Sequence, residues 1–223
     1  MIATYTKDRN YEVLLCEYAA GTLDEPCSLI VASHITLCSD TRQMLHEYEC
    51  IGGAFLDVCD KADLSDNALE SVLSKLDVED KNVKPINSTS AAEQLGFSMP
   101  KALEAYLLEH VELPLKWKKT LPGMVTYELP IEGSDNIARI IKMEPGASVP
   151  SHGHGGQELT LVIDGAMKDE HGDYKVGDLI IQDERFEHTP VAHKEYGCVC
   201  LAVTCAPIKL KGFASLLNPF LSK

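Results

Sequence analysis

The chain has 223 residues, long enough for one domain or two, and its formal net charge is −14 with an isoelectric point near 4.9. This acidic balance argues against direct binding to nucleic acid or to an anionic membrane surface, because both need a basic face, and it favours a basic protein partner. The first residues contain no apolar signal segment, and no stretch approaches the roughly 20 apolar residues that span a bilayer, so we expect a cytoplasmic protein with reduced cysteines.

The first third of the chain has the apolar spacing of amphipathic helices. Thr22 and Glu25 have the spacing of a capping box, which predicts the start of the second helix, and Ser39 can cap the third. We expect the apolar stripes to form mainly the core of a small helical bundle, with one stripe left exposed for a partner. The predicted helices cover residues 11–20, 28–37, 40–56 and 67–76.

The composition changes after residue 76, where a polar, proline-containing stretch without periodicity predicts a linker over residues 81–98. This linker separates a helical domain, residues 1–80, from a second domain, residues 99–223, which opens with a helix and ends with a short one over residues 212–221. Between these helices, short apolar runs separated by Gly, Pro and Asp have the rhythm of a double-sheet jelly roll. Strands are predicted over residues 124–129, 136–143, 158–163, 178–182 and 196–204. The predicted fold class is therefore multi-domain α + β.

The glycine-rich stretch 146–165 carries the residues of a metal site. Residues two apart on an extended strand project to the same face, so His152 and His154 can direct both imidazoles at one point. Glu158 can approach that point from the other side, and His188 is the candidate for a fourth ligand. Neutral imidazoles together with one carboxylate suit zinc, iron, manganese or nickel.

The same stretch resembles the cupin family. Gly146, five residues, His152-Gly-His154, three residues, Glu158, six residues and Gly165 match the first cupin motif position for position. Gly177 and His188 keep their places in the second motif, where Asp183 and Arg185 replace a proline and a glycine. The resemblance implies a double-stranded β-helix that holds one divalent metal per chain through His152, His154, Glu158 and His188, with zinc favoured over iron, manganese or nickel. Asp164-Gly165 also predicts a hairpin turn after the strand.

The N-terminal third carries a second resemblance, in Tyr18-Ala-Ala-Gly21-Thr-Leu, Ser28-Leu-Ile-Val-Ala-Ser-His34, Leu37-Cys38 and Gly52-Gly53. These segments are similar to the start of ChrR-type anti-sigma factors, which join a helical zinc-binding domain to a C-terminal cupin. The resemblance implies a negative regulator of transcription initiation, in which residues 1–80 sequester an extracytoplasmic-function sigma factor. It also implies that the cupin takes part in sensing or release under oxidative stress.

The zinc site of that family's helical domain is only partly present. The family uses a histidine ahead of the first helix and then His-x3-Cys-x2-Cys. This chain keeps His34 and Cys38, whereas Thr41 stands at the last cysteine and Arg9 stands about where the first histidine belongs. His34 and Cys38 are therefore either a weak or vestigial second metal site or simply a helix-terminal histidine and a half-buried cysteine. Two carboxylates could replace the missing donors, Asp8 and Asp40.

Two further functions stay open. A cupin metalloenzyme, such as a dioxygenase or isomerase, is one, although only Glu184, Arg185 and Glu187 beside His188 offer further polar groups near the ligands. A small-ligand-binding cupin that signals through the helical domain is the other. A metal-binding regulator is favoured over an enzyme, and a homo-oligomer formed through the cupin stays open. The pair Cys198 and Cys200 is expected to be core packing, with a thiol sensor as the alternative.

Overall fold

The computed structural model describes residues 9–76, 90–153, 155–205 and 209–210. His154, the closing helix over residues 212–221 and the first half of the predicted linker lie outside the described residues. The helices are α1 (Arg9–Ala19), α2 (Glu25–Leu37), α3 (Ser39–Asp57), α4 (Ala68–Leu76), α5 (Ala91–Leu95) and α6 (Lys101–His110). The strands are β1 (Lys118–Leu121), β2 (Met124–Glu128), β3 (Ile137–Met143), β4 (His152–Gly153), β5 (Glu158–Lys168), β6 (Asp173–Lys175), β7 (Leu179–Gln182), β8 (Glu187–His188), β9 (Val191–Ala192), β10 (Cys198–Thr204) and β11 (Lys209–Leu210).

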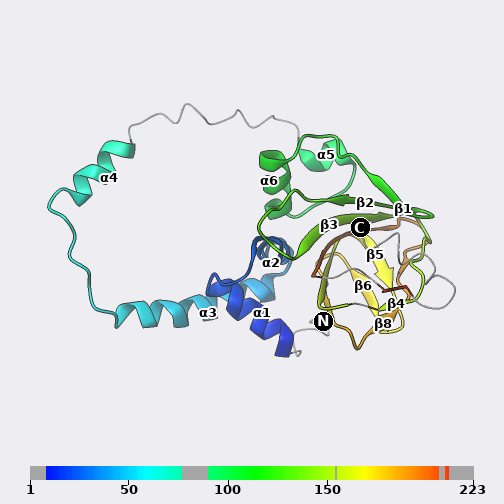
Figure 1. Ribbon diagram of the computed structural model, residues 1–223, viewed down its shortest axis with the longest axis horizontal. Helices are drawn as coiled ribbons and strands as arrows, with labels where there is room; N and C mark the ends of the chain where they lie inside the picture. The colour runs from blue at the N-terminus through cyan, green and yellow to red at the C-terminus, as the bar shows by residue number, and fades with distance from the viewer. Residues whose placement is uncertain (1–8, 77–89, 154, 206–208, 211–223) are drawn as a thin grey trace.

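The strands form a larger and a smaller sheet, and the helices lie to one side of them (Figure 1). The larger sheet follows the order β1-β2-β3-β10-β5-β6, with β7 and β9 also paired to β5. The smaller sheet follows the order β11-β4-β8. All of these pairs are antiparallel, and β10 lies between β3 and β5, so distant segments pair as they do in a jelly roll. The predicted class, helices followed by a jelly-roll domain, is confirmed.

The predicted capping box at the second helix is wrong. α2 begins at Glu25, three residues before the predicted start, because Asp24 occupies the cap position. Its carboxylate accepts a hydrogen bond from the Cys27 N–H at 3.2 Å. Thr22 donates its hydroxyl to the Glu17 carbonyl instead, at the end of α1.

Two other helix boundaries differ from the prediction. Ser39 is the first residue of α3, and Cys38 holds the cap position without a side-chain cap bond. α5 lies within the predicted linker. Ser90 caps α5 by accepting from the Ala92 N–H at 3.1 Å, and Gly96 ends it with a φ of 72°. A helix of five residues is too short to show an amphipathic period in the sequence.

The predicted hairpin turn at Asp164-Gly165 is also wrong. β5 runs through both residues to Lys168, and its pairing register with β10 shifts between Val199 and Cys200. Gly165 has a φ of 70°, and a Cβ at this position would collide with the Gly197 carbonyl. The glycine therefore lies inside a long strand that contains a bulge nearby, and not in a turn. Glycine is needed there because the two backbones approach too closely for any side chain.

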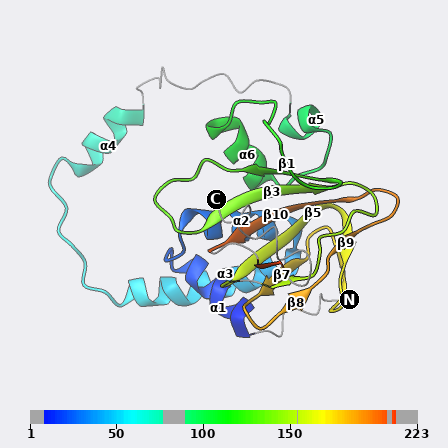
Figure 2. The ribbon, with the colours of Figure 1, turned by 45° about the vertical axis from the view of Figure 1, so that its right-hand side comes forward.

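The first two helices share a core with the sheet. Leu15, Ile30 and Val31 are completely buried, and they belong to the same cluster as Leu161 and Leu201 of the sheet. α2 packs against β3, β5 and β10 on one side and against α6 on another (Figure 2). The free energy of burying these side chains, about 2 kcal/mol each, therefore stabilises the helices and the sheet together.

The second half of α3 and all of α4 lie outside this core. α4 has no buried residue, and it stands apart from the rest of the described chain (Figure 1). Phe55 is 69% exposed and Leu69 is 72% exposed. The apolar stripe of α4 is thus the one left uncovered. Among the described residues, no helix has the length and apolar character needed to cross a membrane.

Candidate metal centre

The two short strands β4 and β8 bring His152 and His188 together. The two residues are directly paired across the strands, and each is 4% exposed. Their Nε2 atoms are 3.0 Å apart and their ring centroids are 4.5 Å apart. The residues are 36 positions apart in the sequence, so the close approach of the two imidazoles depends on the pairing of β4 with β8.

The other ring nitrogen of each histidine, Nδ1, donates a hydrogen bond to a nearby oxygen. His152 Nδ1 lies 3.0 Å from the Pro150 carbonyl oxygen, which can only accept. His188 Nδ1 lies 2.9 Å from a carboxylate oxygen of Asp169 and 3.0 Å from the Gln182 amide. The bond to the ionised carboxylate is the stronger of the two, so it sets the tautomer, with the proton on Nδ1.

This arrangement suits a cation between the rings. With both Nδ1 atoms protonated, neutral imidazoles present their Nε2 lone pairs to each other at 3.0 Å. Two lone pairs repel at that distance unless a proton or a metal ion lies between them. Two nitrogens bound to one tetrahedral zinc, each at about 2.05 Å, stand about 3.3 Å apart, so the observed spacing fits a shared metal ion after a small adjustment.

The remaining predicted ligands are placed less directly. Glu158 begins β5, is paired with Gln182 of β7, and accepts a hydrogen bond from the Thr160 hydroxyl at 2.9 Å. Gln182 in turn contacts His188, so the carboxylate belongs to the same end of the sheet. His154 is not described. Within the described ranges, no group of three or more His, Cys, Asp or Glu side chains is gathered for a metal, and His152 and His188 are the two ligands that the structure brings together.

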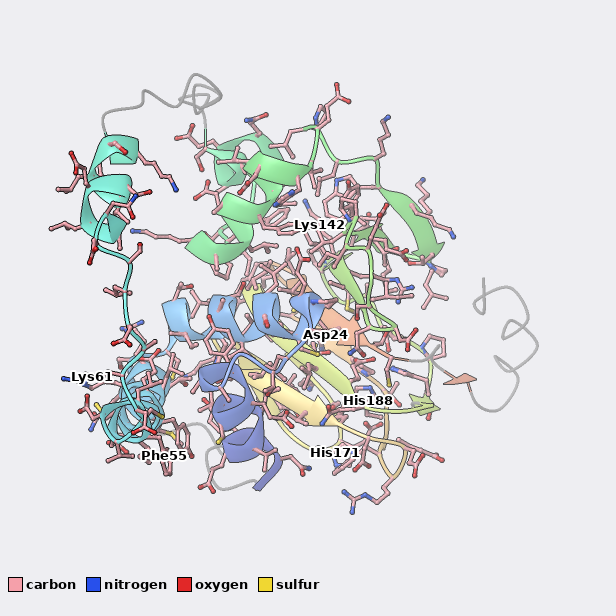
Figure 3. The ribbon with its side chains drawn as sticks, turned by 60° about the vertical axis from the view of Figure 1, so that its left-hand side comes forward. Asp24, Phe55, Lys61, Lys142, His171 and His188 are labelled. Carbon is pink, nitrogen blue, oxygen red and sulfur yellow. The ribbon has the colours of Figure 1, made fainter. Side chains whose placement is uncertain are left out.

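Asp169 is a residue of this centre that the sequence reasoning missed. Its side chain is 1% exposed, in the turn between β5 and β6, and besides His188 it accepts from the His171 N–H at 2.8 Å and from the Tyr174 hydroxyl at 3.0 Å. Burial would raise the pKa of Asp169, but the hydrogen bond from His188 and the others outweigh it and lower the pKa. His188 and the neighbouring His171 are labelled in Figure 3. No motif spacing marks this aspartate, because it approaches His188 only through the fold.

Replacing Asp169 with asparagine should weaken metal binding about 10- to 100-fold, because a neutral amide no longer holds the proton of His188 Nδ1 by charge. The measurement is a competition titration of the full chain with a chelator of known zinc affinity. Asp173→Asn, at an exposed position in the same hairpin, is the matched control. An affinity within twofold of the wild-type value for Asp169→Asn would show that the carboxylate does not support the site.

Asp183 and Arg185, which replace the proline and glycine of the second cupin motif, build the turn before β8 themselves. The Asp183 carboxylate accepts from the Arg185 N–H at 2.9 Å, and the guanidinium of Arg185 binds the same carboxylate. The Phe186 N–H closes the turn on the Asp183 carbonyl at 3.1 Å. An aspartate whose side chain accepts a hydrogen bond from the backbone two residues ahead stabilises a turn, so this turn forms here without the proline and glycine of the motif.

His34 is held in a different network, in the helical part of the chain. Its Nδ1 donates to the Gly177 carbonyl at 2.9 Å, and its Nε2 lies 2.8 Å from the Tyr11 hydroxyl and 3.0 Å from the Thr41 hydroxyl. The two hydroxyls are 2.5 Å apart, and all three side chains are buried. Thr41, at the position of the family's last cysteine, and Tyr11 thus surround His34 with neutral partners. Both nitrogens of His34 are engaged without Cys38.

This network predicts a pH dependence of stability. Burial lowers the pKa of His34 to about 4, whereas the unfolded chain takes up the same proton near pH 6.5. The stabilisation is therefore fully present above pH 6.5 and is lost as the pH falls towards 4. Between pH 7.5 and pH 5 the loss should be about 2 kcal/mol.

The check is urea unfolding of the wild type and of His34→Gln at both pH values. The carboxylates titrate in both proteins, so the difference between their pH dependences isolates the histidine. Equal losses in the two proteins would contradict the neutral, buried state of His34.

Comparisons with known proteins identify the family of this chain. Residues 113–206 match the family model described as the ChrR cupin-like domain. The anti-sigma-E factor ChrR of Cereibacter sphaeroides is 37% identical over 210 residues, which cover 94% of this chain and 95% of that protein. The crystal structure of Rhodobacter sphaeroides SigE in complex with the anti-sigma ChrR matches with a TM-score of 0.70 and 35% identity, over 86% of this chain and 96% of that chain. The match extends over the helices and the sheets alike, and the chain therefore belongs to the family of ChrR anti-sigma factors.

Proposed function

We propose that this chain is an anti-sigma factor. Residues 1–80 bind and sequester an extracytoplasmic-function sigma factor, and the chain thereby represses transcription initiation in the cytoplasm. The observation that carries the proposal is the uncovered apolar surface of α3 and α4, in a family whose member ChrR was solved in complex with SigE. Residues 99–223 form the metal-binding part.

The surface for the partner is the docking arm, by which we mean residues 49–76, from the second half of α3 to the end of α4. Apolar side chains that are each more than half exposed follow one another along it. An amphipathic helix without a covering surface is the usual form in which one protein inserts a helix into the groove of another. The exposed apolar residues of the docking arm are Ile51, Phe55, Leu56, Val58, Leu64, Leu69, Val72, Leu73 and Leu76.

The charge of the helical part indicates the character of the partner. Residues 9–76 contain twelve acidic and four basic side chains, a net charge of −8. Within the docking arm, aspartates are interspersed with the apolar residues from the last residue of α3 to the turn before α4, at positions 57, 60, 63 and 66. A basic groove with an apolar floor is the complementary surface, and long-range attraction would speed the encounter at low salt.

We further propose that the cupin part holds one divalent metal ion per chain, most simply zinc. The family suggests metal binding, and the facing Nε2 atoms of His152 and His188 support the assignment. Glu158 and His154 complete the proposed ligand set. A zinc ion would supply structural cross-linking between β4, β5 and β8 without redox chemistry. No metal is assigned to His34 and Cys38, because the imidazole is already engaged on both nitrogens. A role of the cupin metal in sensing or release stays a prediction.

The proposal is tested by capturing the tagged full chain from its own cells and identifying the bound proteins. We expect one sigma factor at a one-to-one ratio, and we expect the purified chain to block transcription by the holoenzyme that contains it. A second sigma factor from the same cells serves as the specificity control. If the folded chain captures no sigma factor and leaves transcription unchanged, the anti-sigma function is excluded.

A further inference from the structure

A polar cluster fastens the first turn of α2 to the loop before β3. The Asp24 carboxylate, which caps α2, accepts from the Ser134 hydroxyl and from the Asn136 amide, the latter at 2.7 Å. The Asn136 amide also lies 3.6 Å from the sulfur of Cys27. Asp24 is labelled in Figure 3, where α2 meets the sheet. Cys27 is half-buried at this junction of helix and sheet.

A second thiol reaches the same place from β10. Thr204 and Ile137 form the last pair between β10 and β3, and Cys205 and Asn136 are the residues just beyond it. Asn136 directs its amide to Cys27, and the charge of Cys205 acts on the Cys27 thiol. Both observations place Cys205 at the end of β10 that lies near Cys27.

Successive side chains of β10 point alternately to the two faces of the sheet, and one of these faces is covered by α2. Val199, Leu201 and Val203 belong to the core cluster that contains α2, whereas Cys198 and Cys200 belong to the cluster on the other face. Cys205 directly follows the last residue of β10 and lies two positions beyond Val203, whose side chain is in the core cluster that contains α2. It is exposed, and its thiol lies 3.7 Å from the Gln157 carbonyl, so an oxidant in solution can reach it.

The charge of Cys205 also affects the pKa of the Cys27 thiol. Burial raises the pKa of Cys27 to about 12, and the nearby Asp24 carboxylate and the charge of Cys205 add to the effect. Cys27 is therefore a protonated thiol that an oxidant does not attack directly. Cys205, the exposed member of the pair, is the one that reacts first.

We propose that Cys27 and Cys205 form a disulfide under hydroperoxide oxidation and that this bond fastens α2 to the end of β10. In the first step the Cys205 sulfur attacks the peroxide, the O–O bond breaks, and Cys205 sulfenic acid and a molecule of water or alcohol form. In the second step Cys27 displaces hydroxide from that sulfur and its thiol proton leaves with it as water. Two thiols are thereby oxidised and one peroxide is reduced.

The cross-link goes beyond the proposed partner binding, and its test does not depend on that function. It closes a loop between residues 27 and 205, so the unfolded chain loses much of its freedom and the oxidised protein unfolds at a higher temperature. The docking arm is left as it is. Oxidation of this pair should therefore make the helices and the sheet harder to separate without covering the surface of α3 and α4.

The experiment treats the dilute full chain with hydrogen peroxide, alkylates the remaining thiols under denaturing conditions and identifies linked peptides by mass spectrometry. We expect one peptide pair that joins Cys27 to Cys205, a mass lower by two hydrogen atoms, and a thermal midpoint higher by several degrees than in the reduced protein. Cys27→Ser and Cys205→Ser should each remove the linked pair and the shift. Cys50→Ser, at an exposed position on α3, should leave both in place.

The competing pair is Cys198 and Cys200, whose sulfurs are 3.4 Å apart in the interior. A linked peptide that joins those two, with Cys27 fully alkylated, would overturn the proposal. Sulfinic acid at Cys205 together with a free Cys27 would overturn it as well, because the second thiol would then lie too far away to complete the bond.

Discussion

Replacing His152 and His188 together with alanine is expected to reduce the metal content of the purified chain from about one ion to below a tenth of an ion. The two Nε2 atoms stand 3.0 Å apart with both lone pairs facing inwards, which is the arrangement that a shared metal ion needs. A metal present at about 1,000 times its dissociation constant adds about 4 kcal/mol to stability. Losing it should lower the thermal midpoint by roughly 10 °C in a chain of this size.

The measurement is elemental analysis of the full chain alongside thermal unfolding with and without a chelator. Two controls locate the metal. His171→Ala removes a histidine from the neighbouring turn and should retain the ion, and Cys38→Ser should retain it too, because the proposed site does not use that thiol. Full metal content in the double variant would refute the assignment to the cupin. Loss of metal in Cys38→Ser would show that the helical part holds an ion after all.

Replacing Phe55 and Leu73 with serine is expected to weaken sigma-factor binding at least 100-fold. Phe55 is 69% exposed on α3 and Leu73 is 51% exposed on α4, so each is free to enter a partner. Central apolar anchors of an interface typically contribute about 2 kcal/mol or more each, and a loss of about 3 kcal/mol corresponds to more than a 100-fold change in affinity. Stability should change little, because neither side chain is part of the folded core.

Calorimetric titration of the purified sigma factor with each variant measures this effect. Tyr196→Ser is the matched control, since Tyr196 is 62% exposed in the turn before β10, outside the docking arm. Its affinity should equal that of the wild type. Unchanged affinity in the Phe55→Ser, Leu73→Ser double variant would place the sigma-factor surface elsewhere on the chain. An equal loss in the control would point to nonspecific apolar association.

Local patterns were sufficient to predict the order and type of most elements. Helical spacing predicted α1 to α4, and short apolar or alternating runs predicted β2, β3, the first half of β5, β7 and β10, because these signals reside in residues a few positions apart. Local patterns gave the wrong prediction where contact with a distant part of the backbone determines the conformation. Asp164-Gly165 has the composition of a turn, yet β5 continues through it and pairs with β10. Gly165 is needed there because the carbonyl of Gly197, the residue before β10, leaves no room for a Cβ.

The sequence by itself determined the family, the succession of helices and jelly roll, and the histidine and glutamate pattern of the cupin, since each depends on spacing along the chain. Only the tertiary structure decided how those parts meet. The contacts of His188 with Asp169 and of His34 with Tyr11 and Gly177 join residues from separate elements. Likewise, α2 and α4 both carry apolar side chains, but α2 is covered by β3, β5 and β10 whereas α4 has no buried residue. The hydrophobic effect drives an apolar face to be buried, and which surface buries it depends on the path of the rest of the chain.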